Sequence, residues 1–231
     1  MTAERRIKLL DLFCGGGGGA LGYHRAGIAD ITGIDISRKP RYPYTFIQTD
    51  ALTYLQEHWQ EYDAIHASPP CQKWVPLSQM RDNPREHGDF LTPTMQLLPE
   101  LGKPYIVENV QTAPMPSNLM LCGSMFDLPI LRHRKFATNF FVPQLPCRHD
   151  EQDYIIGVYG SGGIMVNERG YATQRFRNRK EAADAMGGLH WMKNIKEITE
   201  AIPPAYTEYI GRYLIEYIEY RREECPAPDQ R

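Results

Sequence analysis

Short apolar runs alternate with segments of helical periodicity over the first half of the chain. Five runs are typical of buried strands, at residues 7–13, 31–35, 45–48, 62–67 and 104–107. Helical spacing occupies three intervening segments, residues 20–26, 50–59 and 94–101. This alternation predicts an α/β fold with a mostly parallel sheet and helices on both faces. Ligands are then expected at the carboxyl ends of the strands.

The second half of the chain is less regular. Residues 119–126 and 135–141 are expected to add strands to the sheet. Residues 143–190 carry glycine-rich and basic stretches with weak periodicity, which predicts a small irregular lobe. From Pro204 onward the pattern is helical again, with Tyr206, Ile210, Tyr213, Leu214 and Tyr217 recurring on one side. We expect this last helix to pack back on the sheet.

Composition fits a globular chain with one core. The 231 residues are 42% hydrophobic, enough for a full α/β core with a small appended lobe. No apolar run is long enough to span a membrane, and no apolar signal segment precedes the first strand. We therefore expect a cytoplasmic protein with no membrane partner.

Five cysteines are spread through the sequence, and no two form a CxxC pair: Cys14, Cys71, Cys122, Cys147 and Cys225. Their odd number and wide spacing predict neither a disulfide framework nor a zinc site, so no metal is expected. In a reducing compartment, a cysteine inside a proline-rich loop becomes a candidate nucleophile.

The net charge of −2 does not by itself indicate a nucleic-acid partner. Basic residues nevertheless gather in two places, residues 132–135 and residues 169–180, and the second stretch has no acidic residue. Either cluster alone is typical of an ordinary solvated face. Beside an active-site motif they would suit phosphate contacts, for which the candidates are Arg175, Arg177, Arg179 and Lys180.

Five glycines, residues 15–19, follow the first predicted strand directly. Glycines there let the backbone approach a ligand closely, and the following helix N-terminus favours negative charge. Asp35 ends the second strand, where a carboxylate suits a ribose, and Asp50 follows the third. Asp50 fits a helix cap equally well. Because five glycines satisfy almost any glycine spacing, the loop alone does not identify the ligand.

Three further motifs end or follow later strands. Two prolines before Cys71 stiffen its loop and fix the direction of a thiol that is a strong nucleophile as thiolate. Glu108 closes the fifth strand, where burial would raise the pKa of a carboxyl and suit it to act as an acid. Arg132 and Arg134 are two residues apart, which on a strand places both on one face. Each motif alone also has an ordinary structural explanation.

Taken in order, these motifs resemble the DNA (cytosine-5) methyltransferase family. The family reads D-L-F-x-G-x-G-G, P-C-Q, E-N-V and Q-x-R-x-R; this chain has DLFCGGGG, PPCQ, ENV and residues 130–134. The similarity covers residues 9–141 and resumes over residues 191–211. It implies a Rossmann-like fold of the class I S-adenosylmethionine-dependent methyltransferases. Residues 1–142 would be the catalytic domain, 143–190 a small target-recognition region and 191–231 a segment packing back on the catalytic domain.

The resemblance also implies roles for individual residues. Cys71 would add to C6 of cytosine, Glu108 would protonate N3, and Arg134, with Arg132 as a second candidate, would orient the base. The target base would be flipped out of double-stranded DNA, with Gln72 among the DNA contacts. The enzyme would act as a monomer in a bacterial or phage-infected cell. S-adenosylmethionine would be held by Asp11, Phe13, Cys14, Gly15, Gly17, Asp35, Ile36, Asp50, Ala51 and Pro69.

Three departures from the family pattern limit these expectations. Ile130 stands where the family has glutamine, and residues 200–204 replace the Gly-Asn pair that precedes its last motif. The region for target recognition is also short, which suggests a phage or mobile-element enzyme reading a short site. Three alternatives remain: an RNA (tRNA) cytosine-5 methyltransferase, a nicotinamide oxidoreductase suggested by the glycine loop, and an inactive DNA-binding module.

Overall fold

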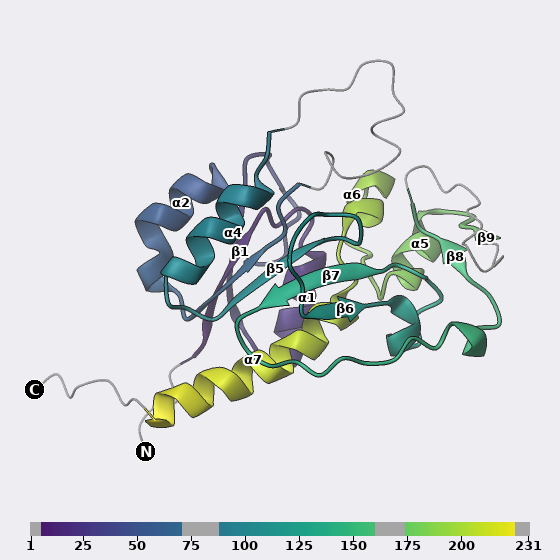
Figure 1. Cartoon of the computed structure of the whole chain (residues 1–231). Helices are drawn as coiled ribbons and strands as arrows, with labels where there is room; N and C mark the ends of the chain where they lie inside the picture. The colour runs from purple at the N-terminus through teal and green to yellow at the C-terminus, as the bar shows by residue number, and fades with distance from the viewer. Residues whose placement is uncertain (1–5, 71–87, 160–173, 225–231) are drawn as a thin grey trace, which may run out of the picture.

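The computed structural model describes residues 6–70, 88–159 and 174–224. Within these ranges seven strands form one sheet in the order β3-β2-β1-β4-β5-β7-β6 (Figure 1). The first five in chain order are mutually parallel, and β7 runs antiparallel to both β5 and β6. The strands are β1 Lys8–Leu12, β2 Asp30–Asp35, β3 Thr45–Gln48, β4 Ala64–Ala67, β5 Tyr105–Val110, β6 Leu119–Leu121 and β7 Arg134–Thr138. The mostly parallel α/β sheet predicted from the alternation is confirmed.

The strand order reverses between β1 and β4. From β1 the chain proceeds outward to β2 and β3, then returns to pair β4 on the other side of β1. In open α/β sheets, ligands bind where neighbouring connections leave in opposite directions, beyond the carboxyl ends of the strands. The glycine loop after β1 and the proline loop after β4 both begin at this switch point.

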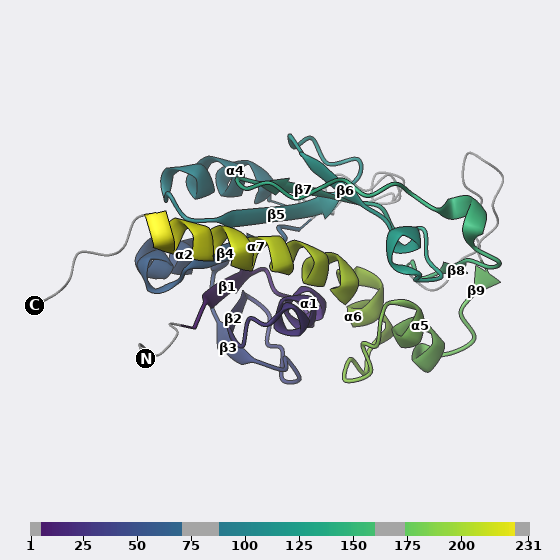
Figure 2. The same ribbon diagram turned by 90° about the horizontal axis from the view of Figure 1, so that it is seen from below.

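Helices cover both faces of the sheet, as the alternation predicted. Leu9 and Leu10 are both fully buried but belong to different hydrophobic clusters, because successive strand residues point to opposite faces. The cluster around Leu9 includes side chains of α1 (Gly18–Ala26) and α7 (Pro204–Glu224); the cluster around Leu10 includes those of α2 (Ala51–His58) and α4 (Leu91–Glu100). Figure 2 shows α7 running across the sheet beside α1.

Helices α1 and α7 approach closely because glycines face the contact. A Cβ on Gly22 would lie 2.0 Å from the Thr207 hydroxyl, and one on Gly211 would lie 2.8 Å from the Ala26 Cβ. The Thr207 hydroxyl also donates a hydrogen bond to the carbonyl of Gly19 at 2.8 Å. The expectation that the last helix packs back on the sheet is confirmed, and its partner is the helix that follows the glycine loop.

A third hydrophobic cluster lies beyond β7. It joins β8 (Ile156–Gly157), α5 (Arg179–Ala185) and α6 (Ile195–Glu200), and β8 pairs in parallel with β9 (Gln174–Arg175). Ile130 is 1% exposed and packs in this cluster, which accounts for an apolar side chain where the family has glutamine. The cluster draws on residues from both sides of positions 142 and 190, where the sequence suggested boundaries.

Several predicted element boundaries were wrong. Residues 119–126 form only the short strand β6, after which a 3-10 helix, η3 (Gly123–Phe126), turns the chain away. The fifth strand continues through Val110, so Glu108 lies within β5 and pairs with Phe136 of β7. Two more 3-10 helices, η1 (Trp59–Glu61) and η4 (His149–Glu151), and helix α6 were not anticipated. In the described part of the chain, no helix combines the length and apolar character needed to cross a membrane.

Candidate active site

The glycine loop leaves β1 through three residues with left-handed backbone. Phe13 has φ 56°, Gly15 52° and Gly17 85°, and Gly17 forms the N-cap of α1. Apart from its two chain neighbours, no described residue has an atom within 4 Å of where a Gly15 Cβ would be, so this backbone is open on the side of the described residues. Cys14, between them, is buried at 7% exposure, and burial raises the pKa of its thiol. The loop therefore offers backbone amides to a ligand, and the buried Cys14 thiol is not a reactive group.

Asp35, at the end of β2, holds the loop in place. Its carboxylate accepts hydrogen bonds from the backbone N–H of Gly15 at 3.1 Å and of Ser37 at 2.8 Å. The Lys39 ammonium lies 3.4 Å from the same carboxylate. Two carboxylate oxygens can accept about four hydrogen bonds, so Asp35 keeps capacity for a further donor. The next residue, Ile36, is 68% exposed and offers an apolar surface beside the carboxylate.

The other two acidic candidates are engaged with the protein. Asp11 is 2% exposed and accepts a hydrogen bond from the Tyr42 hydroxyl at 2.9 Å. Burial raises its pKa to about 7, against the Tyr42 bond, which lowers it. Asp50 caps α2 by accepting a hydrogen bond from the Thr53 N–H at 2.9 Å, and Ala51 behind it is buried. The helix-cap interpretation of Asp50 is confirmed, and Asp11 supports the loop from beneath.

The base of the proline loop is fixed by two neighbouring strands. The Ser68 hydroxyl donates a hydrogen bond to the Phe13 carbonyl at 3.2 Å. The buried Asn109 side chain donates to the Pro69 carbonyl at 3.0 Å. Pro69 itself is buried, so the chain leaves this point in a defined direction. Cys71 and Gln72, the predicted nucleophile and DNA contact, lie outside the described residues.

Glu108 and Arg134 form a buried ion pair across β5 and β7. The Arg134 Nε lies 2.8 Å from the Glu108 Oε1, and the carboxylate side chain is 8% exposed. Burial raises the pKa of Glu108, while Arg134 and then Arg132 lower it, and the raising effect is larger. A carboxyl with a raised pKa beside a fixed cation is suited to hold or deliver a proton.

Arg132 does not share the site of Arg134. It precedes the strand, and its guanidinium donates to the carbonyls of Val158 at 3.0 Å and Thr199 at 2.7 Å. The residue is 3% exposed. The expectation that both arginines extend from one strand face was therefore wrong, because β7 begins only at Arg134. Arg132 instead ties the sheet edge to the third cluster and to α6.

The basic residues predicted to contact DNA occupy the region around α5. Arg175 on β9 is exposed. Two others pair along the helix, Arg177 with Glu181 at 2.8 Å and Lys180 with Asp184 at 2.7 Å. Arg179 donates to the carbonyls of His190 and Met192 and so holds the following segment. Arg175, Arg177 and Lys180 are exposed, whereas Arg179 is partly buried.

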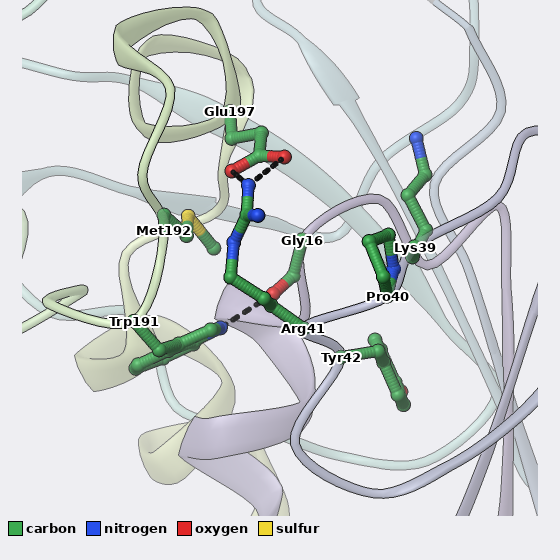
Figure 3. Close-up of a pocket in the computed structure, with 8 residues that line it drawn as sticks. All are labelled: Gly16, Lys39, Pro40, Arg41, Tyr42, Trp191, Met192 and Glu197. Carbon is green, nitrogen blue, oxygen red and sulfur yellow. Dashed lines mark hydrogen bonds and ion pairs between the residues drawn. The ribbon is translucent and has the colours of Figure 1, made fainter.

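The sequence analysis missed a contact that closes the glycine loop. The Trp191 indole donates a hydrogen bond to the Gly16 carbonyl at 2.9 Å, and Arg41 pairs with Glu197 at 3.3 Å beside it (Figure 3). The hollow between them encloses about 210 Å³ including its open mouth. This is below the ~300–1,000 Å³ typical of a small-molecule site. Trp191 and Gly16 are 175 residues apart in the sequence, and no local sequence pattern predicts that they are in contact.

Comparison with known proteins is consistent with this geometry. The family model for C-5 cytosine-specific DNA methylases matches residues 7–118, which include the glycine, PPC and ENV motifs. The type II methyltransferase M.FnuDI of Fusobacterium nucleatum is 29% identical over 112 residues, 46% of this chain. The chain spans about a third of the length of that relative, since the match covers 33% of it.

Solved methyltransferases share the fold over nearly the whole chain. A DNA modification methyltransferase encoded within an Escherichia coli prophage aligns with TM-score 0.62 at 13% identity, covering 92% of this chain and 99% of the other. Spodoptera frugiperda DNMT2 aligns with TM-score 0.60 at 13% identity, over 90% and 99%. At such identity the likeness establishes the Rossmann-like methyltransferase fold alone. The family-model match over residues 7–118 adds similarity in the motifs to C-5 cytosine-specific DNA methylases.

Proposed function

We propose that this chain transfers a methyl group to C5 of cytosine in double-stranded DNA, with Cys71 as the nucleophile. One observation carries most of this proposal. The Asn109 amide bonds the Pro69 carbonyl, two residues before Cys71, while the adjacent Glu108 is paired with Arg134. The strand that carries the acid thus holds the base of the loop that carries the thiol. A nicotinamide oxidoreductase or an inactive binding module gives no reason for that connection.

The chemistry divides between three side chains. The Cys71 sulfur forms a bond to C6 of the cytosine while Glu108 delivers a proton to N3, so that ring electrons move toward C5. Arg134 holds the Glu108 carboxyl in position and would help to orient the base. C5 then bonds to the methyl group. When the C5 proton is afterwards lost to solvent, the bond to Cys71 breaks, N3 returns its proton to Glu108, and the thiolate is regenerated. Because a stacked base cannot reach such a site, the target must be flipped out of the duplex.

The residues present fit S-adenosylmethionine. Its sulfonium supplies the methyl group when it is bound. The open backbone at Gly15, the Asp35 carboxylate and the exposed Ile36 suit an amino-acid group, a ribose and an adenine face respectively. Phe13 and Gly17 shape the loop, and Trp191 covers it from the opposite side. Asp11, Cys14, Asp50 and Ala51 act from beneath the site, since their side chains are buried or cap α2.

The decisive experiment combines a nucleophile variant with a trapping substrate. Wild-type protein, labelled S-adenosylmethionine and duplex DNA should give labelled 5-methylcytosine, and Cys71→Ala should abolish labelling while still binding S-adenosylmethionine. DNA containing 5-fluorocytosine should form a covalent complex with the wild type, because C5 then has no removable proton. Retained methylation by Cys71→Ala would overturn the mechanism, and bisulfite sequencing of DNA from expressing cells would reveal the target site.

An RNA substrate is the principal alternative, because the same catalytic residues would serve a cytosine in tRNA. The exposed Arg175 suits either backbone. Parallel assays with duplex DNA and with tRNA separate the two. Methyl transfer to tRNA alone would preserve the chemistry and overturn the proposed substrate.

A further inference from the structure

Four soft side chains converge beside β7, away from the glycine loop. Cys122 follows β6, His133 precedes β7, and Cys147 and His149 lie in the connection to β8. Their donor atoms all lie within 4.8 Å of one another. Cys122 is fully buried, the two histidines are partly buried and Cys147 is exposed, so the cluster opens to solvent on one side. None of these residues has a part in the proposed methyl transfer.

The distances match what a tetrahedral metal requires. The Cys122 Sγ lies 3.3 Å from the His149 Nε2, and the Cys147 Sγ lies 3.5 Å from the His133 Nε2. Zinc bonds sulfur at ~2.3 Å and imidazole nitrogen at ~2.0–2.1 Å, which puts tetrahedral neighbours about 3.3–3.8 Å apart. The two imidazole rings lie nearly perpendicular, at 81°, with centroids 5.2 Å apart. Both rings therefore direct a nitrogen toward the two sulfurs without stacking on each other.

We propose that Cys122, His133, Cys147 and His149 bind one structural Zn²⁺ ion. Two thiolates and two neutral imidazoles are a ligand set that closes a tetrahedral zinc site and balances its charge. Binding displaces the two thiol protons, which leave to solvent, and involves no change of oxidation state. The absence of CxxC pairs argued against zinc from sequence alone. The fold instead gathers the ligands from three segments, with spacing C-x10-H-x13-C-x-H.

Neighbouring groups support the ligands as an outer shell does in metal sites. The Ser124 hydroxyl donates to the Cys122 Sγ at 3.4 Å and accepts a hydrogen bond from the Arg148 N–H at 3.1 Å. The Arg148 guanidinium, between the ligands Cys147 and His149, donates to the Met125 carbonyl and pairs with Asp127 at 2.9 Å. The loop that brings two ligands is thus fastened to η3, which directly follows the buried ligand Cys122.

The position of His133 connects the zinc site to the active site. His133 lies between Arg132, which anchors the third cluster, and Arg134, which pairs with Glu108. A metal bound to His133 would fasten this tripeptide to the loop at residues 147–149. We infer that the ion fixes where the lobe begins relative to the catalytic ion pair, and takes no part in the chemistry.

Metal analysis of the intact protein tests the site directly. Protein expressed with zinc in the medium and purified without chelator should carry about one zinc per chain. The double variant Cys147→Ser, His149→Asn, chosen because neither residue is fully buried, should fall to background. The matched control Cys225→Ser, His58→Asn should keep its zinc. Cobalt(II) exchange should give intense bands of tetrahedral cobalt and a thiolate charge-transfer band in the wild type and the control only.

Three results would overturn the proposal. The first is wild-type protein that purifies without zinc and does not take up cobalt. The second is a double variant that keeps the metal, which would place the metal elsewhere. The third is a disulfide between Cys122 and Cys147, found by peptide mapping under non-reducing conditions. The three readouts are the metal content of the protein, the absorption spectrum of bound cobalt and the covalent state of the cysteines. None of them depends on whether the protein methylates DNA.

Discussion

The side-chain amide of Asn109 donates a hydrogen bond to the carbonyl of Pro69 at 3.0 Å, and both residues are buried. We predict that Asn109→Asp lowers kcat for methylation by one to two orders of magnitude, since about 1–3 kcal/mol is lost when a buried acceptor is left unsatisfied. An aspartate has nearly the same shape but, when ionised, cannot donate this bond.

The measurement is single-turnover methylation together with calorimetric binding of S-adenosylmethionine. The dissociation constant for S-adenosylmethionine should stay within about twofold, because Asn109 positions the nucleophile loop and not the glycine loop. The matched control is Asn118→Asp, which makes the same change at an exposed position bonded to Thr138. Equal losses in the two variants would show that the effect is one of general stability.

Glu108→Gln is expected to lower kcat by about 10²- to 10⁴-fold, the usual contribution of a general acid, while S-adenosylmethionine binding is retained. Glutamine fills the same space but cannot release a proton to N3. Steady-state methylation assays at fixed DNA concentration measure the effect, with the exposed Glu57→Gln as control. Wild-type rates in Glu108→Gln would contradict the assignment of the acid.

Arg134 should control the pH range of activity. Because Arg134 lowers the pKa of Glu108 against the raising effect of burial, Arg134→Gln should raise that pKa further. The protonated form of Glu108 is the active one, so activity falls as pH rises through its pKa. The alkaline limb of kcat/KM should therefore move to higher pH in Arg134→Gln, at a lower overall rate. A shift to lower pH would contradict the ion pair as the source of the effect.

Trp191→Ala is expected to weaken S-adenosylmethionine binding by about tenfold, because a hydrogen bond of about 1 kcal/mol to Gly16 is lost together with packing over the loop. Trp191→Phe, which keeps a ring but loses the bond, should lie between that variant and the wild type. Titration calorimetry measures all three proteins. Unchanged affinity in Trp191→Ala would show that the tryptophan does not border the cofactor.

His66 should make stability fall with acid. It is fully buried in β4, its Nδ1 lies 2.8 Å from the Tyr23 hydroxyl, and burial lowers its pKa from 6.5 to about 3. Below pH 6.5 the unfolded chain takes up a proton that the folded chain does not. The contribution of His66 to the free energy of unfolding is therefore complete above pH 6.5 and is lost as pH falls toward 3, at roughly 1 kcal/mol per unit.

Urea unfolding at several pH values measures this dependence as the difference between wild type and His66→Gln. That difference should shrink between pH 6.5 and 5. Tyr23→Phe removes the hydrogen bond but leaves His66 buried, so it should keep the wild-type pH dependence. A difference that is constant with pH would show that the pKa of His66 is the same in the folded and unfolded chains.

The sequence predicted the sheet well because its strands are short apolar runs bounded by glycine, proline or acidic residues. It predicted Asp35 at the end of β2 for the same reason, since parallel strands gather their carboxyl ends at one edge. Glu108 was also expected at a strand end, but it lies within β5, which continues through Val110. It placed Arg132 wrongly because alternation along a strand holds only where the strand exists, and β7 begins two residues later.

Other features depend on contacts between distant segments and left no local signal. Trp191 contacts Gly16 from a position 175 residues later in the sequence. Cys122, His133 and the pair Cys147 and His149 meet only because β6 and β7 lie side by side at the sheet edge. Rules that recognise metal ligands from their spacing assume a local sequence motif. These four residues come from separate segments, which the strand topology brings together.

The close crossing of α1 and α7, at Gly22 on one helix and Gly211 on the other, also sets an order of events during synthesis. Residues near Gly22 leave the ribosome first, whereas Thr207 and Gly211, which they pack against, are made about 185 residues later. At a synthesis rate of about 5–20 residues per second, roughly 10–40 s pass between the synthesis of β1 with its loop and the synthesis of α7. The nascent chain must therefore expose the apolar side of α1 over this interval, and the packing behind the glycine loop is complete only when α7 has been made.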